Sequence, residues 1–233
     1  MVEDFQNYEI RESCSFAGGA RVSKALVLLS GGIDSATALY LVKQQFDELY
    51  SLNLVYTQSY DNEAEAAKKV ASEAQVEEHL SVYAPFFEDI SNRYRPRYSD
   101  TISSAYVPAR NIVFHGIAAA YAEAMDVGTV VIGSNADDAK ELPDARSNFV
   151  QLMNDLLKMG TRTGMEGTSI AIMSPLIELT KPEVVRLALR LKVPLQYTWS
   201  CYGNAKIPCG KCRGCRMRAQ AFTAIGARDP LTA

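Results

Sequence analysis

The segment that most constrains the fold is a glycine-containing loop between an apolar run and a helical pattern. It reads Ser30-Gly31-Gly32-Ile33-Asp34-Ser35, directly after the run Ala25–Leu29 and before a helix expected over 35–45. Two adjacent glycines let the main chain turn tightly and approach a ligand closely. Successive N–H groups at the start of a helix attract anions. This order therefore predicts a phosphate-binding loop at the end of a strand.

The loop differs from two common nucleotide-binding loops. A Walker loop would need a lysine after its second glycine, and a dinucleotide fingerprint would need a third glycine. The motif is similar to the PP-loop, which in its families holds the pyrophosphate of ATP. The Ser30 and Ser35 hydroxyls would then donate to phosphate oxygens, and Asp34 would cap the helix, place a magnesium ion, or do both. A glycine turn with a serine cap is the alternative.

Strand and helix patterns alternate along the chain. Further strands are expected over 49–56, 129–132 and 170–173, and helices over 64–74, 111–125, 149–158 and 181–191. Such alternation predicts an α/β fold with a doubly wound, mostly parallel sheet, whose ligands lie at the carboxyl ends of the strands. We expect an N-terminal extension over 1–24, an ATP-binding domain over 25–195 and a small C-terminal zinc-binding lobe over 196–233.

Charge and hydropathy bound the function. The formal net charge is -3 and the pI about 5.5, which argues against broad nucleic-acid binding. No window approaches the roughly 18 apolar residues of a membrane helix. The segment Met1–Ser13 is acidic, whereas a secretory signal begins with basic residues. The sequence predicts a cytoplasmic protein with no membrane association.

Four cysteines crowd into one short stretch, at Cys201, Cys209, Cys212 and Cys215, whereas Cys14 stands far upstream. Four thiolates complete a tetrahedral zinc site and leave no open position, so a structural zinc ion is predicted. An iron–sulfur cluster also takes four thiolates, and a redox pair would use only two of them. A zinc ribbon that grips nucleic acid is a further alternative, because lysines and arginines surround the cysteines.

The phosphate loop and the cysteine cluster, with the segments between them, resemble the 7-cyano-7-deazaguanine synthase (QueC) family. The similarity runs from about Lys24 to Phe222. The matching stretches are Leu28–Ser35, Val107-Pro108-Ala109-Arg110-Asn111, Pro143-Asp144-Ala145-Arg146, Pro175-Leu176, Thr180-Lys181, Thr198-Trp199-Ser200-Cys201-Tyr202 and Pro208–Arg218.

The resemblance implies an enzyme and its chemistry. It implies that ATP activates the carboxylate of 7-carboxy-7-deazaguanine as an adenylate, which ammonia converts into an amide. A second ATP would activate the amide oxygen, and loss of AMP would leave the nitrile. ATP, a structural Zn²⁺ and Mg²⁺ are the implied cofactors, and a homodimer is the implied assembly.

The same resemblance suggests a role for each matching residue. Asp34 and Lys181 would be catalytic. Leu29, the six loop residues and Arg110 would bind ATP, and the substrate-binding residues would be Asn111, Asp144, Arg146 and Gln58. Simpler alternatives are a solvent-facing Lys181, Arg110 and Asn111 that merely begin a helix, and a surface ion pair between Asp144 and Arg146.

Two segments depart from the family pattern. After the second strand the family has Asp-Tyr-Gly-Gln, where this chain has Val55-Tyr56-Thr57-Gln58, and Ala145 stands where the family has cysteine. These departures leave open a relative that delivers the activated acid to another amine, such as one on a protein. A tRNA-thiolating PP-loop enzyme and a non-catalytic nucleotide sensor are further alternatives. His79 and His115 are predicted to be packing residues.

Overall fold

The structure, a computed structural model, describes residues 23–56, 61–94, 106–203 and 205–232. The strands are β1 (Lys24–Leu28), β2 (Glu48–Val55), β3 (Glu78–Tyr83), β4 (Thr129–Val131) and β5 (Ala171–Met173). They form a parallel sheet in the order β3-β2-β1-β4-β5. Strand order therefore reverses between β1 and β4, and ligands of such sheets bind outside the carboxyl ends of the strands at this reversal.

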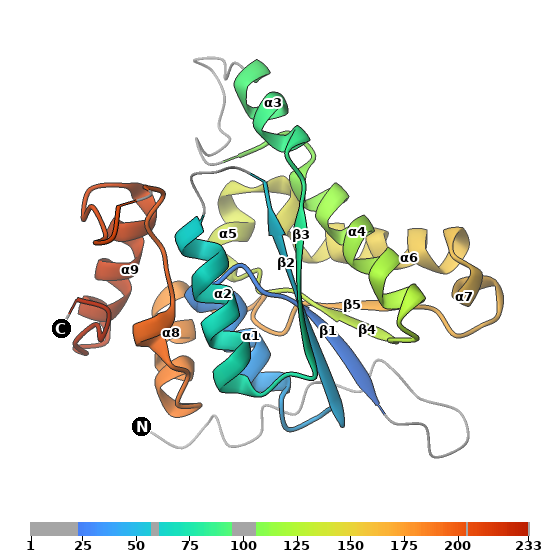
Figure 1. The fold of residues 1–233 in the computed structure, drawn as a ribbon, viewed down its shortest axis with the longest axis horizontal. Helices are drawn as coiled ribbons and strands as arrows, with labels where there is room; N and C mark the ends of the chain where they lie inside the picture. Colours follow the sequence, from blue (N-terminus) through green and yellow to red (C-terminus); the bar gives the residue numbers. More distant parts are fainter. Residues whose placement is uncertain (1–22, 57–60, 95–105, 204, 233) are drawn as a thin grey trace.

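Helices cover both faces of the sheet (Figure 1). They are α1 (Ile33–Val42), α2 (Asp61–Ala74), α3 (Phe86–Arg93), α4 (Arg110–Ala124), α5 (Ala136–Glu141), α6 (Ser147–Gly160), α7 (Arg162–Met165), α8 (Lys181–Arg190) and α9 (Arg213–Ala224), with short 3₁₀ turns at Pro143–Ala145 and Leu195–Tyr197. Helices α1, α2, α8 and α9 lie on one side, and α4, α6 and α7 on the other. The predicted doubly wound α/β fold is confirmed.

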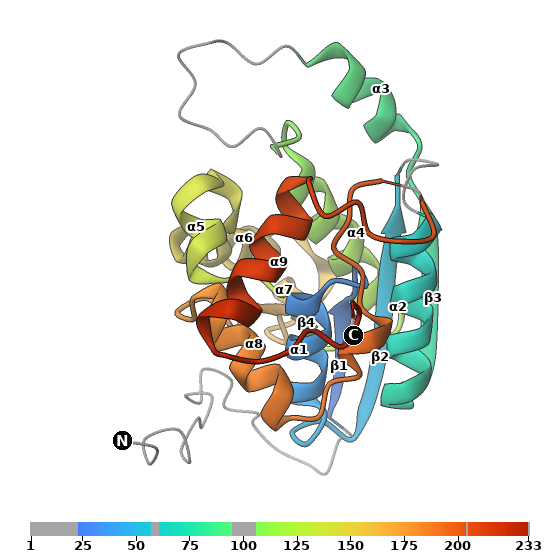
Figure 2. The ribbon, with the colours of Figure 1, turned by 90° about the vertical axis from the view of Figure 1, so that its left-hand side faces the viewer.

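Two hydrophobic cores lie on opposite faces of the sheet. Alternation along a strand sends successive side chains to opposite faces. Val27 and Leu29 accordingly pack with the helices around α1, whereas Leu26 and the partly buried Leu28 pack with α4 and α6. Figure 2 shows the first of these faces, with α1, α2, α8 and α9 in front of the sheet. None of the described helices has the length and apolar character needed to cross a membrane.

The C-terminal segment packs on the first core. Ala221 and Phe222 of α9 belong to that core. Arg218 is almost fully buried, and its Nε and Nη2 donate to the Asp229 carboxylate at 2.7 and 2.8 Å. The predicted division at residues 195 and 196 stays a prediction. Of the predicted extension over 1–24, residues 1–22 lie outside the described part, and Lys24 begins β1.

Candidate active site

Hydrogen bonds of two serine hydroxyls and a glycine with positive φ fix the conformation of the loop after β1. Ser35 Oγ donates to Gly32 O at 3.2 Å and lies 3.1 Å from Ser30 Oγ. Gly31 has φ +85°, and a Cβ there would lie 2.4 Å from Glu63 O, so only glycine fits. Gly32 is the N-cap of α1, and no side chain caps this helix. The capping role suggested for Asp34 is therefore not seen.

Asp34 instead forms an ion pair with Lys181, which lies 147 positions further along the chain. Lys181 is held at the start of α8, where the Lys181 N–H donates to Asp137 Oδ2 at 2.8 Å. The preceding Thr180 N–H donates to the Glu183 carboxylate, also at 2.8 Å. The Lys181 ammonium group is therefore not a freely solvated surface charge. The other carboxylate oxygen of Asp34, Oδ1, is buried and has no hydrogen-bond partner in the described structure.

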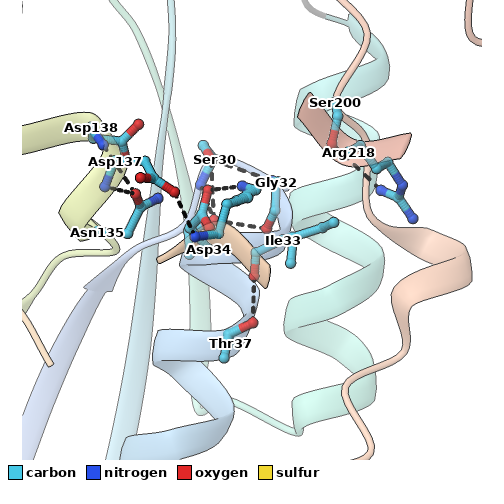
Figure 3. Close-up of polar contacts among 12 residues, drawn as sticks. Ser30, Gly32, Ile33, Asp34, Thr37, Asn135, Asp137, Asp138, Ser200 and Arg218 are labelled. Carbon is cyan, nitrogen blue, oxygen red and sulfur yellow. Dashed lines mark hydrogen bonds and ion pairs between the residues drawn. The ribbon is translucent and has the colours of Figure 1, made fainter. Parts of the chain in front are cut away.

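A second acidic segment faces the loop from the end of β4 (Figure 3). Asn135 caps α5 by accepting from the N–H groups of Asp137 and Asp138 at 2.9 and 3.0 Å. Burial, and then the charge of Asp34, raise the pKa of Asp138 to about 6. The cap thus fixes a carboxyl group beside Asp34, where an added cation would relieve the mutual repulsion of the two carboxylates.

A cavity of about 720 Å³ lies over the carboxyl ends of β1, β2 and β4. Its lining includes five of the eight predicted ATP-binding residues, which are Leu29, Ser30, Asp34, Ser35 and Arg110, and the predicted substrate-binding residue Asn111. The volume falls in the range of small-molecule sites, roughly 300 to 1,000 Å³. This cavity is where the reversal of strand order places a ligand, so it is the candidate active site.

One side of the cavity is lined by Arg110 and Phe114 of α4 together with Tyr56, which follows β2. Arg110 Nη1 donates to the Tyr56 hydroxyl at 3.2 Å, and the guanidinium lies 6.0 Å from the ring centres of both Tyr56 and Phe114. Phe87 packs edge-on against Phe114, with ring centres 5.2 Å apart. These contacts hold a positive charge at the cavity edge, where a phosphate or a carboxylate would be attracted.

Glu63 brings a further carboxyl group to the cavity. It lies at the start of α2, beside the phosphate loop, and the described structure gives it no hydrogen-bond partner. Burial raises the pKa of Glu63 to about 7, although the nearby Arg110 guanidinium acts in the opposite direction. A substantial fraction of this carboxyl is therefore protonated at neutral pH.

The raised pKa of Glu63 predicts that the stability of the protein depends on pH. Because the pKa of Glu63 in the folded state is above its ordinary value of 4.5, the folded state binds the proton more tightly. The free energy of unfolding therefore falls as pH rises from about 4.5 to 7. We expect E63Q, which carries no charge, to be about 1 to 2 kcal/mol more stable than the wild type at pH 8, and no more stable at pH 4.5.

Urea unfolding at both pH values measures this difference. The matched control is E65Q, because Glu65 lies on the same helix and is exposed. An equal difference between E63Q and the wild type at both pH values would contradict the assignment.

The four clustered cysteines converge on one point. Their Sγ atoms all lie within 4.8 Å of one another, and those of Cys209 and Cys215 are 4.0 Å apart. Tetrahedral zinc with Zn–S bonds of ~2.3 Å places sulfurs about 3.8 Å apart, so the set fits such an ion. The Cys212 N–H donates to Cys209 Sγ at 3.3 Å and is the largest of the contacts that lower the pKa of that thiol to about 6. Thiolates held in this way are the ligands zinc requires.

The cysteine segment also reaches the active site. Trp199 N donates to Gly31 O at 2.8 Å, which ties the chain just before Cys201 to the phosphate loop. Tyr202 and Arg213 line the cavity, and Arg213 pairs with Glu141 of α5. A metal bound by the cysteines would therefore hold one side of the cavity as well as its own loop.

Of the predicted substrate-binding residues that the structure describes, only Asn111 lines the cavity. Its Nδ2 donates to Asp144 O at 3.0 Å. Asp144 is buried below this contact, whereas Arg146 is exposed and donates to Ala139 O, so the alternative of an ion pair between them is not seen. Neither side chain lines the cavity. Gln58 lies outside the described residues.

Sequence reasoning missed Asp138 and Gly133. A Cβ at Gly133 would lie 2.7 Å from Ser35 N, so this glycine lets α1 start against the end of β4. The signal was present, because polar residues and a glycine directly follow a buried strand in Gly133-Ser134-Asn135. Recognising it requires knowing that β4 lies beside β1.

Comparison with known sequences gives the family. Residues 24–226 match the family described as queuosine biosynthesis protein QueC. The chain belongs to the QueC family. A 7-cyano-7-deazaguanine synthase of Trichodesmium erythraeum is 40% identical over 220 residues, which cover 89% of this chain and 99% of that relative. One from Oceanobacillus iheyensis is 38% identical over 217 residues, with 89% and 97% covered.

Among solved structures, an NH3-dependent NAD synthetase from Campylobacter jejuni is similar with a TM-score of 0.49 and 19% identity. That match covers 77% of this chain and 68% of the synthetase. The QueC match spans both the phosphate loop and the cysteine cluster.

Proposed function

We propose that the protein is an ATP-dependent ligase that converts 7-carboxy-7-deazaguanine into 7-cyano-7-deazaguanine, with release of AMP and pyrophosphate. One observation carries the proposal. A chain of the QueC family places its phosphate loop, with the Asp34–Lys181 ion pair, in a cavity at the reversal of strand order. The curated relatives of similar length are named for this activity.

The reaction has two activation steps. A carboxylate oxygen of the acid attacks the α-phosphorus of ATP, and pyrophosphate leaves. Ammonia then attacks the carbonyl carbon, AMP leaves and an amide forms. The amide oxygen attacks the α-phosphorus of a second ATP, and pyrophosphate leaves. Loss of both amide protons and of AMP then leaves the nitrile. The enzyme's part is to orient the reactants and neutralise charge.

Each step draws on groups in the cavity. The main-chain N–H groups of Ser30–Ser35 would hold the departing diphosphate, and Lys181 and Arg110 would neutralise its charge. Asp34 and Asp138 offer the carboxylate oxygens that a magnesium ion prefers, and an ion held there would neutralise charge on the phosphates. Ammonium must lose a proton before it attacks, and Glu63, with a pKa of about 7, lines the same cavity.

The cysteine cluster would have a structural role. Cys201, Cys209, Cys212 and Cys215 would hold a zinc ion that stabilises the fold and takes no part in the chemistry. Asn111 would contact the acid substrate, and Gln58, Asp144 and Arg146 remain proposed contacts. The family resemblance further implies a homodimer and a cytoplasmic location.

The test is an incubation of the purified protein with ATP, magnesium and 7-carboxy-7-deazaguanine, with and without ammonium. We expect pyrophosphate in both reactions, whereas the release of AMP and the nitrile found by mass spectrometry should require ammonium. AMP without nitrile, together with label from the acid on a protein, would mean that another amine is the acceptor. ATP binding without AMP release would mean a nucleotide sensor and would contradict the proposal.

A further inference from the structure

We propose that His115 is a substrate-binding residue whose Nδ1 hydrogen-bonds the heterocycle of the acid substrate. The inference rests on the proposed function and adds a contact that decides which heterocycle the cavity accepts. His115 was predicted from the sequence to be a packing residue. Its burial agrees with that prediction, but one of its ring nitrogens is not accounted for by packing.

The first observation is an unpaired polar atom in the cavity wall. His115 is only 3% exposed, and its Nδ1 is buried with no hydrogen-bond partner in the described structure. Buried polar groups are almost always paired, because an unpaired one loses its water without compensation. His115 also lines the cavity. A ligand in that cavity is therefore the partner that the imidazole lacks.

The second observation is the position of His115 relative to the phosphate loop. His115 lies on α4, one helical turn after Asn111, so both residues share one face of this helix. Helix α4 packs on the sheet face that carries Leu26 and Leu28, whereas the loop leads into α1 on the opposite face. A triphosphate seated on the loop would leave the α4 side of the cavity to the second substrate.

The third observation is that the ring is uncharged and held in place. Burial lowers the pKa of His115 to about 4, so the imidazole is neutral at neutral pH. Its ring centre lies 5.5 Å from that of Phe149 on α6, which limits the positions the ring can take. A neutral imidazole offers one donor and one acceptor, which suits the ring nitrogens and carbonyl of a deazaguanine. It offers no charge to a carboxylate.

These features also orient the acid. Its heterocycle would lie against α4, with the polar edge at His115, while its carboxylate is drawn toward Arg110, Lys181 and the phosphate loop. This is the direction the chemistry requires, because the carboxylate oxygen must reach the α-phosphorus of ATP. His115 would thus contribute to discrimination between heterocycles, since a heterocycle without a hydrogen-bonding group at this position would leave Nδ1 unpaired.

Three substitutions separate a hydrogen-bonding role from a packing role. Asparagine places its amide near the position of Nδ1, glutamine reaches toward that of Nε2, and leucine fills the space with no polar atom. We expect H115L and H115Q to raise the KM for 7-carboxy-7-deazaguanine about tenfold or more, and H115N to stay within about threefold of the wild type. The KM for ATP should not change in any of them.

The matched control is H79L, which alters the other of the two histidines. His79 lies on β3, where its Nδ1 is 2.8 Å from Ser51 Oγ, and it does not line the cavity. We expect H79L to keep both KM values. Thermal unfolding of each variant shows whether it is folded, and titration calorimetry of the acid without ATP gives a reading that does not depend on turnover.

Weaker acid binding in H115L and H115Q, retained in H115N, supports the inference. Equal acid affinity in H115L and the wild type would overturn it, as would a rise in the KM for ATP alone, which would assign the imidazole to the adenine. If H115L does not fold, the comparison of H115N with H115Q decides. If the wild type binds the acid but never releases AMP, the proposed function is contradicted, whereas the role of His115 in binding the acid is not.

Discussion

The D34N variant should release AMP about 10²- to 10³-fold more slowly than the wild type at saturating ATP and acid. Asparagine keeps the size of the side chain but removes the charge that pairs with Lys181. It also removes one of the two carboxylates from which a magnesium ion would be held near the phosphate loop. The loss should therefore appear in the rate of adenylate formation and much less in the affinity for the acid.

The measurement is AMP release under single-turnover conditions with ammonium present, and D155N is the matched control. Asp155 lies exposed on α6, so that variant should keep wild-type rates. Thermal unfolding of D34N establishes that the protein is folded, since Lys181 loses its partner in this variant. AMP release by D34N at the wild-type rate would show that the chemistry does not take place at this loop.

The second large effect concerns the cysteine cluster. We expect the purified protein to hold one zinc ion per chain, and C212S to lose it together with about 4 kcal/mol or more of the free energy of unfolding. Cys201 and Cys215 are buried, so an incomplete site would leave thiolates without their ion. Because Trp199 N bonds to Gly31 O, loss of the metal should also weaken nucleotide binding.

Elemental analysis and urea unfolding of C212S test this expectation. The control is C14S, which removes the fifth cysteine, far upstream of the other four in the sequence. We expect it to keep both the metal and the stability of the wild type. A metal-free C212S variant that unfolds at the same urea concentration as the wild type would contradict a structural role, and iron in place of zinc would change the assigned metal.

The sequence predicted the features that arise from local patterns. The phosphate loop was predicted between a strand and a helix because the glycine pair, the apolar run and the helical pattern lie in consecutive positions. The cysteine cluster was predicted because its four ligands all lie between residues 201 and 215. Both depend on contacts between residues close in the chain, so both could be read directly.

The missed elements have weak local signals. Strand β3 is a partly exposed edge strand with the sequence EHLSVY, and α5 has the polar sequence ADDAKE, so neither shows a buried apolar period. Helix α9 begins with basic residues, and its apolar face becomes evident only where Ala221 and Phe222 join the core. Their existence depends on tertiary packing.

The site contacts between distant residues could not be read from local patterns. Asp34 and Lys181 meet only because α1 and α8 pack on the same face of the sheet. The alternative of an ion pair between Asp144 and Arg146 is not seen, since the Asp144 carboxylate turns inward to the Asn111 N–H and Arg146 turns out to solvent. Neighbours in sequence within a turn need not share a direction.

The most direct test of the central claim is the phosphorus-31 spectrum of the wild-type incubation with ATP, magnesium, ammonium and the acid. If the loop holds the departing diphosphate, ATP must split between its α- and β-phosphorus, so AMP and pyrophosphate should accumulate in equal amounts and only when the acid is present. The appearance of ADP and inorganic phosphate in their place would contradict the account.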